Sequence, residues 1–508
     1  MHQPPRNERR DAPEHSRREF LKQSVATGAT VAAAAALPVM AQENAERPRA
    51  GNGAPDRRGS IAETLADFAV RLRYEDLPGD VVRTAKRTIL DTIGCAIGGH
   101  QAGPSRIAVK LAGGVSATPG ATVFCSGIKT SQELAAFANG VMILYLDFND
   151  GYITPMGGGH PSDTLAALLS SAEIAGRSGR DLITATALSY EVFCKVADVL
   201  DSRGLGLDQS TILGLASVVG ASRLMGLTPE QMVHAIGITV GGNTAINQGR
   251  TGTLSNWKDF ASAEASRKAT FAAQLAQAGM TGPSRVFEGP SGFFNVISRK
   301  AFELPKLGEP WGIMKAFTKR FPLGQYSQTV AEAAAQARSF IADTDEIREV
   351  NIRVSRNAIK VMADSPDKWR PQSHETADHS MPYAAAVVMM FGTIDDHYYE
   401  DPYLHDPRLL DLVSRVRCIA SAEADMHEKD YNLCDFEVVL KSGMQKSIRV
   451  EYHRGHPRNP MTDAEMEEKF RSLARRHLSA DRIDALLRQL WNLEDLPKAG
   501  SLVEMTAA

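Results

Sequence analysis

A series of apolar segments rich in alanine and glycine occupies the middle of the chain and restricts its fold more than any other feature. Each segment repeats apolar residues at spacings of three and four, which is the pattern of a helix, and few of them carry a charge. Small residues on every face let helices pack closely around buried central members, so the region predicts a multi-helix bundle. We expect helices at residues 134–146, 164–175, 182–200, 210–225, 232–240 and 261–278.

The pattern changes after about residue 317, where short stretches alternate apolar and polar side chains with a period of two. Three such stretches, at residues 349–355, 434–440 and 445–452, are expected to be strands, and a hairpin-like turn joins the last two. Helical patterns lie between them and resume at Thr462, where Thr-Asp-Ala-Glu resembles a capping box. The intervening helices are expected at residues 327–339, 381–390 and 408–415.

These patterns predict a mainly α protein with two domains. We expect a large all-helical domain that begins with residues 61–316, and a smaller α+β lid domain over residues 317–460. The C-terminal helices, residues 461–508, are expected to dock on the helical domain and complete it. A length of 508 residues with 43% hydrophobic content is ample for a core in each domain.

Charge and cysteine content exclude several classes of protein. The net charge of −3 gives no general basic field, so nucleic acid is not expected as a partner. The five cysteines are scattered and form no CxxC motif, which speaks against a zinc or iron–sulfur site. A Cys418–Cys434 disulfide stays open for an oxidising compartment, although the odd total and the absent pattern argue against it.

The first residues indicate export rather than fold. Residues 16–22, SRREFLK, carry a twin-arginine signature, and an alanine-rich run and a small-residue cleavage context ending at Ala41 follow. We expect a signal peptide over residues 1–41, recognised by the twin-arginine export machinery, and a linker over residues 42–60. The apolar run is too short for a permanent membrane span, so the mature protein is expected to be periplasmic without one. A disordered basic tail is the alternative.

The segment from Leu146 to Asp163, LDFNDGYITPMGGGHPSD, gathers polar groups between two apolar helices. Asp147 and Asp150 lie three residues apart at a helix end, and His160 follows three glycines. Two carboxylates and an imidazole can form a general base with an orienting partner. The alternatives are a polar connector in which Asp163 caps the next helix, or a metal site. We expect no metal, because HxH and HExxH patterns are absent.

Two cationic stretches are candidates for binding an anion. Residues 248–258, QGRTGTLSNWK, place Arg250 and Lys258 at the start of a helix, where a carboxylate or phosphate is favoured. Lys319 and Arg320 lie at the junction of the two domains and would close over a cleft between them. A solvated loop and a basic surface corner are the respective alternatives.

The starts of two predicted helices contain further candidate site residues. In ADHSMPY, His379 begins an apolar helix next to an acid, although Asp378 or Ser380 would serve equally as an N-cap beside a structural histidine. Asp208 lies at a glycine-containing helix entry, GLGLDQ, where it is expected either to face the substrate or to cap the helix.

Taken together and in this order, these stretches resemble the MmgE/PrpD family, which includes 2-methylcitrate dehydratase, cis-aconitate decarboxylase and an iminodisuccinate epimerase. The resemblance covers about residues 61–493. The loop and the GLDQ entry are most similar to the 2-methylcitrate dehydratase branch. The matching motifs are LDFND before GHPSD, RTGTLSNWK, MTGPSRVFEG, KRFP, ADHSMPY and HPRNPMT.

The resemblance also implies roles and an assembly. It places the family's active-site acid at Asp147, its loop histidine at His160, its helix-entry lysine at Lys258, its junction lysine at Lys319 and its second-domain histidine at His379. It implies a homodimer as well. Two positions depart from the family. Gly151 lacks the hydroxyl of a threonine found in many members, and Asp208-Gln209 replaces a His-Pro pair, which argues against decarboxylation.

We therefore expect a cofactor-independent hydro-lyase that acts on a small polycarboxylate. Asp147 or His160 would remove a proton next to a carboxylate and His379 would protonate the departing hydroxyl. Cations would stabilise the developing enolate; these are Lys258, Lys319, Arg320 and Arg250. Because methylcitrate metabolism in the family is cytoplasmic whereas this leader directs export, the substrate can be a different acid. Epimerase, decarboxylase, carboxylate-binding protein and metal-dependent hydrolase are the alternatives.

Overall fold

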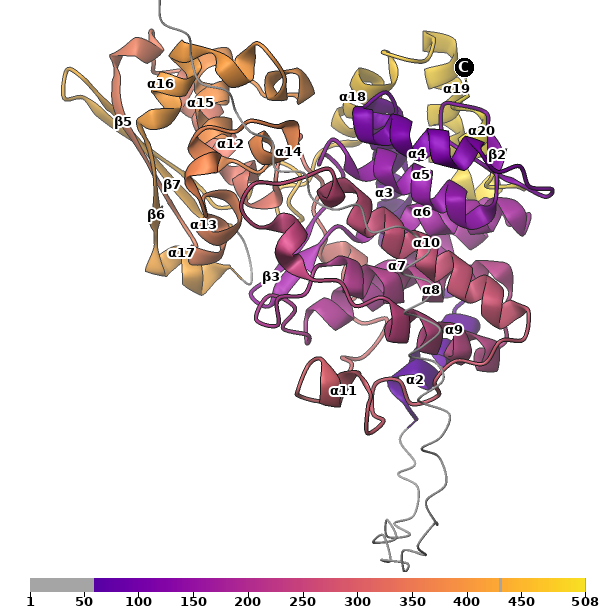
Figure 1. The fold of residues 1–508 in the computed structure, drawn as a ribbon. Coiled ribbons are helices and arrows are strands. Elements are labelled where there is room, and N and C mark those ends of the chain that lie inside the picture. Colours follow the sequence, from indigo (N-terminus) through magenta and orange to yellow (C-terminus); the bar gives the residue numbers. More distant parts are fainter. Residues whose placement is uncertain (1–58, 429–431, 508) are drawn as a thin grey trace, which may run out of the picture. The chain divides into compact units, whose positions relative to one another are not determined.

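A computed structural model describes residues 59–428 and 432–507. The predicted signal peptide and most of the predicted linker lie outside these residues. Within them the protein is mainly α, as predicted, with only small sheets (Figure 1). No helix in the described part of the chain is long and apolar enough to cross a membrane.

The first helical segment contains most of the predicted helices, with ends that differ by a few residues. Helix α8 coincides with its predicted range, whereas α10 begins earlier than expected, at Trp257, which places Lys258 in its first turn. The helices are α2 (Ile61–Arg71), α3 (Gly79–Gly99), α4 (Gly103–Gly113), α5 (Gln132–Leu144), α6 (Leu165–Ile174), α7 (Gly179–Ala197), α8 (Ser210–Met225), α9 (Pro229–Gly242), α10 (Trp257–Gln277) and α11 (Phe293–Val296).

Small residues set how closely the central helices pack. Helix α10 packs against α5, α8 and α9. A Cβ atom on Gly140 of α5 would lie 2.9 Å from the Cβ of Ala263 in α10, so the two backbones approach more closely than a larger residue would allow. Two short hairpins interrupt the helices and were not predicted. They pair β1 (Ala121–Thr122) with β2 (Lys129–Thr130), and β3 (Tyr152–Thr154) with β4 (Gly157–Gly159).

The following segment is built on one four-stranded sheet of order β6-β5-β7-β8. The predicted strands are present as β5 (Ile347–Val354), β7 (Cys434–Leu440) and β8 (Gln445–Val450), which pair in antiparallel fashion. The parallel edge strand β6 (Val416–Ala420) was not predicted. The helices of this segment are α12 (Gln328–Arg338), α13 (Arg356–Met362), α14 (His374–Ala377), α15 (Met381–Phe391), α16 (Pro407–Ser414) and α17 (Ala422–His427).

The last helices return to the first segment. They are α18 (Asp463–Ala474), α19 (Ala480–Trp491) and α20 (Ser501–Glu504), and α18 packs against α3 (Figure 1). The predicted capping box is present at the start of α18: Thr462 accepts from the backbone of Glu465, and Glu465 accepts from the backbone of Thr462.

Buried apolar side chains form two large clusters in the described residues. One joins residues between Ile61 and Ile313 with residues between Met461 and Val503; the other lies between Phe321 and Val450. The cysteines are free, and Cys418 and Cys434 lie on strands that β5 separates, so the disulfide alternative is not realised. The junction between the clusters contains the candidate site.

Candidate active site

Asp147 follows the C-terminus of α5 in a left-handed backbone conformation, with φ 46°. This conformation is uncommon for residues other than glycine, although aspartate tolerates it better than most. The side chain is fully buried. Residues held in sparsely populated conformations cluster at functional sites, because the surrounding structure must impose them.

The ammonium group of Lys319 binds Asp147 twice, donating to its backbone oxygen at 2.8 Å and to its Oδ1. Gly151 and Phe317 pair through their backbones in both directions at 2.9 Å, which brings the junction segment alongside the loop. Burial lowers the pKa of Lys319, and the charge of Asp147 opposes that shift. The buried ammonium and carboxylate groups therefore depend on each other.

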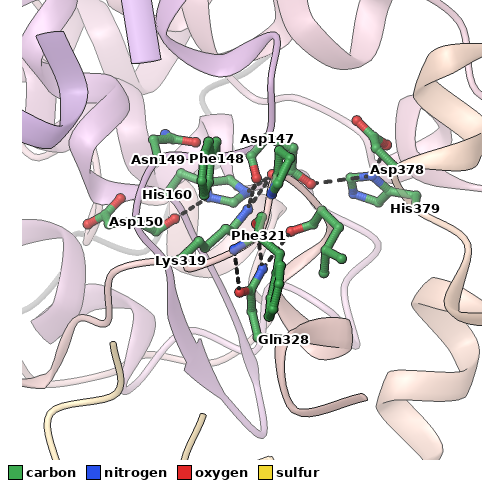
Figure 2. A network of polar contacts seen from close by, with 12 residues as sticks. Asp147, Phe148, Asn149, Asp150, His160, Lys319, Phe321, Gln328, Asp378 and His379 are labelled. Carbon is green, nitrogen blue, oxygen red and sulfur yellow. Dashed lines mark hydrogen bonds and ion pairs between the residues drawn. The ribbon is translucent and has the colours of Figure 1, made fainter. Parts of the chain in front are cut away.

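His160 directs its Nε2 toward Asp147 (Figure 2). Its Nδ1 lies 2.7 Å from the backbone oxygen of Asp150, and because a carbonyl oxygen only accepts, Nδ1 carries the proton. The backbone N–H of His160 donates to Gln209 Oε1 at 2.6 Å. Burial, reinforced by the charge of Lys319, lowers the pKa of His160 to about 3. Its Nε2, 3.5 Å from Asp147 Oδ1, is available to accept a proton.

His379 lies on the opposite side of Asp147 (Figure 2). Its Nδ1 is 2.6 Å from Asp378 Oδ1 and 3.5 Å from Asp147 Oδ2. The other oxygen of Asp378 accepts from Lys258 Nζ at 2.5 Å. Burial and the charge of Lys258 lower the pKa of His379, while the two carboxylates oppose them. The contact between Lys258 and Asp378 joins α10 to the second segment.

Asp378 was not predicted as a site residue. The sequence left open whether Asp378 or Ser380 caps the helix that follows. Ser380 is the N-cap of α15, with its Oγ accepting from the backbone N–H of Tyr383 at 3.1 Å. The carboxylate of Asp378 is therefore free to hold His379. Its position directly before His379 was the signal that would have identified it.

Two buried carboxylates are thus matched by two buried ammonium groups. Burial raises the pKa of Asp147 and Asp378, but Lys258 and His379 lower both values and Lys319 also lowers that of Asp147, so the pKa of each carboxyl lies below the usual range. One ligand atom from each of Asp147, Asp378 and His379 lies within 4.8 Å of the others, a spacing that would suit a metal ion. Because the ammonium groups of Lys319 and Lys258 already pair with these two carboxylates, the residues fit an ammonium-compensated cluster better.

The remaining acids of the loop hold its shape. Asp150 accepts from the Ser162 backbone N–H at 3.2 Å and from the Tyr190 hydroxyl at 2.6 Å. Burial raises the pKa of Asp150 to about 6. Asn149 donates to Ser162 Oγ at 2.9 Å. Asp150 and Asn149 therefore fix the loop end that carries His160.

Asp163 does not cap the helix that follows, contrary to the alternative considered above, since neither helical turn after His160 has a side-chain cap. Instead it is buried, with Oδ1 accepting from Asn149 Nδ2 at 2.7 Å and Oδ2 without a hydrogen-bond partner. Burial raises the pKa of Asp163 to about 7. The folded protein therefore retains a proton on this carboxyl well above the ordinary pKa of aspartate.

The Asp163→Asn variant is expected to gain stability over the wild type as the pH rises from about 4 to 7. Over this range the folded state binds more protons at Asp163 than the unfolded state does, so the wild type loses stability with rising pH. The difference between the two proteins should grow by up to about 4 kcal/mol, at about 1.4 kcal/mol per pKa unit. Chemical unfolding at several pH values measures it. The exposed Asp481→Asn is the control, and a difference that does not vary with pH would contradict the expectation.

Lys469 of α18 contacts the backbone of the two segments that carry Asp147 and Lys319. Its ammonium group donates to the backbone oxygens of Phe148 at 2.7 Å and Lys319 at 3.0 Å, and it pairs with Asp91 Oδ1 at 2.7 Å. The same ammonium group lies 3.9 Å from the centre of the Phe148 ring. A helix near the end of the chain thus joins the loop of Asp147 to the segment of Lys319.

The other predicted binding residues are placed differently. Arg250 donates from Nε to Asp208 Oδ2 at 2.6 Å, while Asp208 Oδ1 accepts from the backbone and hydroxyl of Ser210. Asp208 therefore positions Arg250 and accepts from Ser210, the first residue of α8, and it does not line the cavity described below. Arg320 is exposed, with its guanidinium 5.5 Å from the centre of the Phe321 ring, and it also lies away from that cavity.

Both imidazoles open onto a cavity of about 240 Å³, which suits a small metabolite. Three basic side chains line it, Arg203, Arg250 and Lys360, and its lining contains no aspartate or glutamate. Lys258 and Lys319 are buried behind this wall, where they hold carboxylates of the protein. The remaining lining residues are Gly157, Gly158, Gly159, Ser202, Leu207, Gln209, Asn247, Thr251, Gln325, Tyr326, Val361 and Met362.

The structure therefore brings most of the predicted residues into one cluster. Sequence reasoning did not assign Asp378, Gln209, Arg203 and Tyr326 to the site. Asp378 and Gln209 lie in the motifs ADHSMPY and GLGLDQ noted above, whereas Arg203 and Tyr326 lie in none. The predicted residues that meet around Asp147 are His160, Lys258, Lys319 and His379.

Two family models match the chain. The MmgE/PrpD N-terminal domain matches residues 63–304, and the MmgE/PrpD C-terminal domain matches residues 321–493. The boundary between the matches contains Lys319, so the site draws its residues from both sides of it.

Individual proteins of known activity are similar over most of their length. Cis-aconitate decarboxylase of Homo sapiens is 28% identical over 470 residues, which are 88% of this chain and 94% of that protein. The 2-methylcitrate dehydratase of Cupriavidus necator is 28% identical over 464 residues, 85% of this chain and 93% of that protein. The 2-methylcitrate dehydratase of Escherichia coli K12 is 28% identical over 422 residues, 76% and 84% of the two chains.

Proposed function

The chain belongs to the MmgE/PrpD family, and from this premise we propose that it is a hydro-lyase that removes water from a small polycarboxylate without a cofactor. The relatives described above are dehydratases and decarboxylases, which are both lyases, so the family-level activity is that of a lyase. One observation carries the finer proposal. His160, whose Nδ1 carries a proton and whose Nε2 faces Asp147, lines a cavity together with three basic side chains and no aspartate or glutamate.

We assign the base to His160 rather than to Asp147, because His160 Nε2 carries no proton whereas Lys319 occupies Asp147 Oδ1. The pKa of Asp147 is held below the usual range by Lys319 and Lys258 in spite of its burial, and Lys319 occupies its Oδ1. Asp147 therefore has little affinity for a proton. His160 has its unprotonated nitrogen toward Asp147, so the imidazolium that forms on proton abstraction would be stabilised by a carboxylate 3.5 Å away.

The reaction would proceed in three linked changes. His160 Nε2 takes a proton from the carbon next to a substrate carboxylate, and the electron pair of that bond forms the carbon–carbon double bond by way of an enolate. Arg250, which lines the cavity and is oriented by Asp208, stabilises the enolate oxygen. The carbon–oxygen bond breaks, and the hydroxyl leaves as water with a proton from His379.

The proton on His379 depends on the substrate. Burial and the charge of Lys258 lower the pKa of His379, which disfavours its protonated form. A bound polyanion favours the protonated form. Asp378, at 2.6 Å, and Asp147, at 3.5 Å, would stabilise that imidazolium. Substrate charge would thus help to supply the acid that the reaction needs.

A product screen tests the proposal. The purified protein is incubated with 2-methylcitrate, citrate and related hydroxy acids, and the conjugated double bond is followed by ultraviolet absorbance. We expect an unsaturated acid to accumulate without carbon dioxide. Proton exchange in deuterium oxide without net reaction would instead indicate an epimerase, and binding without turnover of any acid would indicate a carboxylate-binding protein. Activity lost on chelation would indicate a metal-dependent hydrolase.

Decarboxylation is the second candidate, because the human relative is as similar as the dehydratases. The local geometry favours dehydration. Asp208 and Gln209 replace the His-Pro pair of decarboxylase-like members, and they hold Arg250 and the backbone of His160. Carbon dioxide released from cis-aconitate in the same screen would reverse the assignment.

We also propose a periplasmic location and a homodimer. The twin-arginine pattern at residues 16–22 supports export, and the family resemblance supports the dimer. Fractionation of cells that produce the full chain checks the location, and light scattering of the purified protein checks the assembly.

A further inference from the structure

Arg203 is a cation at the cavity wall that neither the sequence motifs nor the proposed mechanism uses. It follows α7, and its side chain is 25% exposed. Its guanidinium lies 5.7 Å from the centre of the Tyr326 ring and donates from Nη2 to the Tyr326 hydroxyl. Arg203 and Tyr326 belong to different halves of the family match, so this contact joins two walls of one cavity.

The other contacts of Arg203 are long. Nη1 lies 3.3 Å from the backbone oxygen of Pro155 and 3.5 Å from Glu428 Oε1. A guanidinium group has five N–H donors in a planar fork that matches a carboxylate with two parallel hydrogen bonds. The contact to Glu428 uses a single long bond. Arg203 is therefore oriented by the protein, with part of its donor capacity unused.

Glu428 can release Arg203 without becoming isolated. It is buried, and its Oε1 also accepts from the Tyr326 hydroxyl at 3.1 Å while its Oε2 accepts from Asn357 Nδ2 at 2.8 Å. A substrate carboxylate would replace only the weakest of its contacts. A carboxylate from the cavity therefore meets a pre-oriented cation at a small cost.

We propose that Arg203 binds a carboxylate of the substrate remote from the reacting carbon, with Tyr326 as the residue that positions it. The inference rests on the proposed function and specifies which class of acid the site accepts. Arg250 serves the carboxylate next to the reacting carbon, and Arg203 selects acids that carry a further carboxylate. Lys360 is exposed and lines the same cavity. Its charge adds electrostatic attraction for a polyanion but does not fix the orientation of the bound acid.

The Arg203→Lys variant tests this proposal. Lysine keeps the positive charge opposite Glu428 but lacks the planar guanidinium group that can form two parallel hydrogen bonds. We expect KM for a tricarboxylate to rise roughly 10- to 100-fold with kcat unchanged, as for the loss of charge-assisted hydrogen bonds. An acid that lacks the remote carboxylate should give the same KM with both proteins. Tyr326→Phe keeps all charges and should raise KM for the tricarboxylate roughly 3- to 10-fold. Arg106→Gln, which changes an exposed arginine of α4, is the control.

The outcomes separate this inference from the proposed function. An equal rise of KM for both acids, or no rise for the tricarboxylate, would overturn the role of Arg203 while turnover still stood. If no acid is turned over, calorimetric binding of the tricarboxylate decides. Weaker binding to Arg203→Lys then supports the site although the lyase proposal has failed, and equal binding rejects it.

Discussion

Replacing His160 with asparagine is expected to lower kcat by a factor of about 10² to 10⁴, the usual contribution of a positioned base. Asparagine has an amide close to the position of Nδ1, so it can still donate to the backbone oxygen of Asp150, which His160 contacts at 2.7 Å. It has no counterpart of Nε2. Fold and substrate binding should therefore persist, while proton abstraction from the substrate fails. Steady-state kinetics of dehydration measures the loss.

His100→Asn is a matched control for this experiment. His100 also places Nδ1 against a backbone oxygen, that of Ile97, at 2.9 Å, but it lies outside the cavity. We expect this variant to keep wild-type kcat. Deuterium exchange at the substrate carbon adds a direct readout of the base. If His160→Asn retains both turnover and exchange, the base is another group, and Asp147→Asn becomes the variant to measure.

Replacing Lys319 with methionine is expected to abolish turnover and to destabilise the fold by about 3–5 kcal/mol, the typical cost of leaving a buried charge without its partner. Lys319 is fully buried and binds both the backbone oxygen and the carboxylate of Asp147. Without it the pKa of Asp147 is expected to rise, because burial is then opposed mainly by Lys258. Denaturant unfolding and steady-state kinetics measure the two effects.

A double variant separates charge balance from chemistry. Asp147→Asn combined with Lys319→Met removes both charges, so stability should recover much of its loss while activity stays absent. Lys315→Met, whose side chain is 48% exposed, is the control for removing a lysine from the same segment. A single Lys319→Met variant as stable as the wild type would mean that Asp147 takes up a proton without a penalty, which the buried pairing does not allow.

Local pattern predicted most of the fold because the helices and central strands carry their own periodicity. Helix α8 coincides with its predicted range, and strand β7 does as well. Strand β6 was missed for a physical reason. It is a parallel edge strand whose partner β5 precedes it by more than sixty residues (Val350 with Val416), and most of its residues are at least partly exposed, so no clean alternation marks it.

Prediction of the site from local sequence patterns was limited in the same way. The motifs indicated His160 and His379, because an imidazole beside acids in a polar stretch is rare enough to notice. They did not indicate what each contacts. The pairing of Lys258 with Asp378 joins residues 120 positions apart, and the exposure of Arg320 follows from a turn that buries its neighbour Lys319. Packing decides which of two adjacent cations turns inward, and the spacing of residues in the sequence does not reveal it.

The position of Lys469 in the chain has a consequence for biosynthesis. The groups proposed for catalysis are all present once residue 379 has been translated, but the ammonium group that ties the loop of Asp147 to the segment of Lys319 comes from α18. A nascent chain therefore carries the reactive groups, and the contacts that Lys319 and Phe317 make with the loop, before Lys469 is present. The site gains its last supporting contacts only when α18 has left the ribosome.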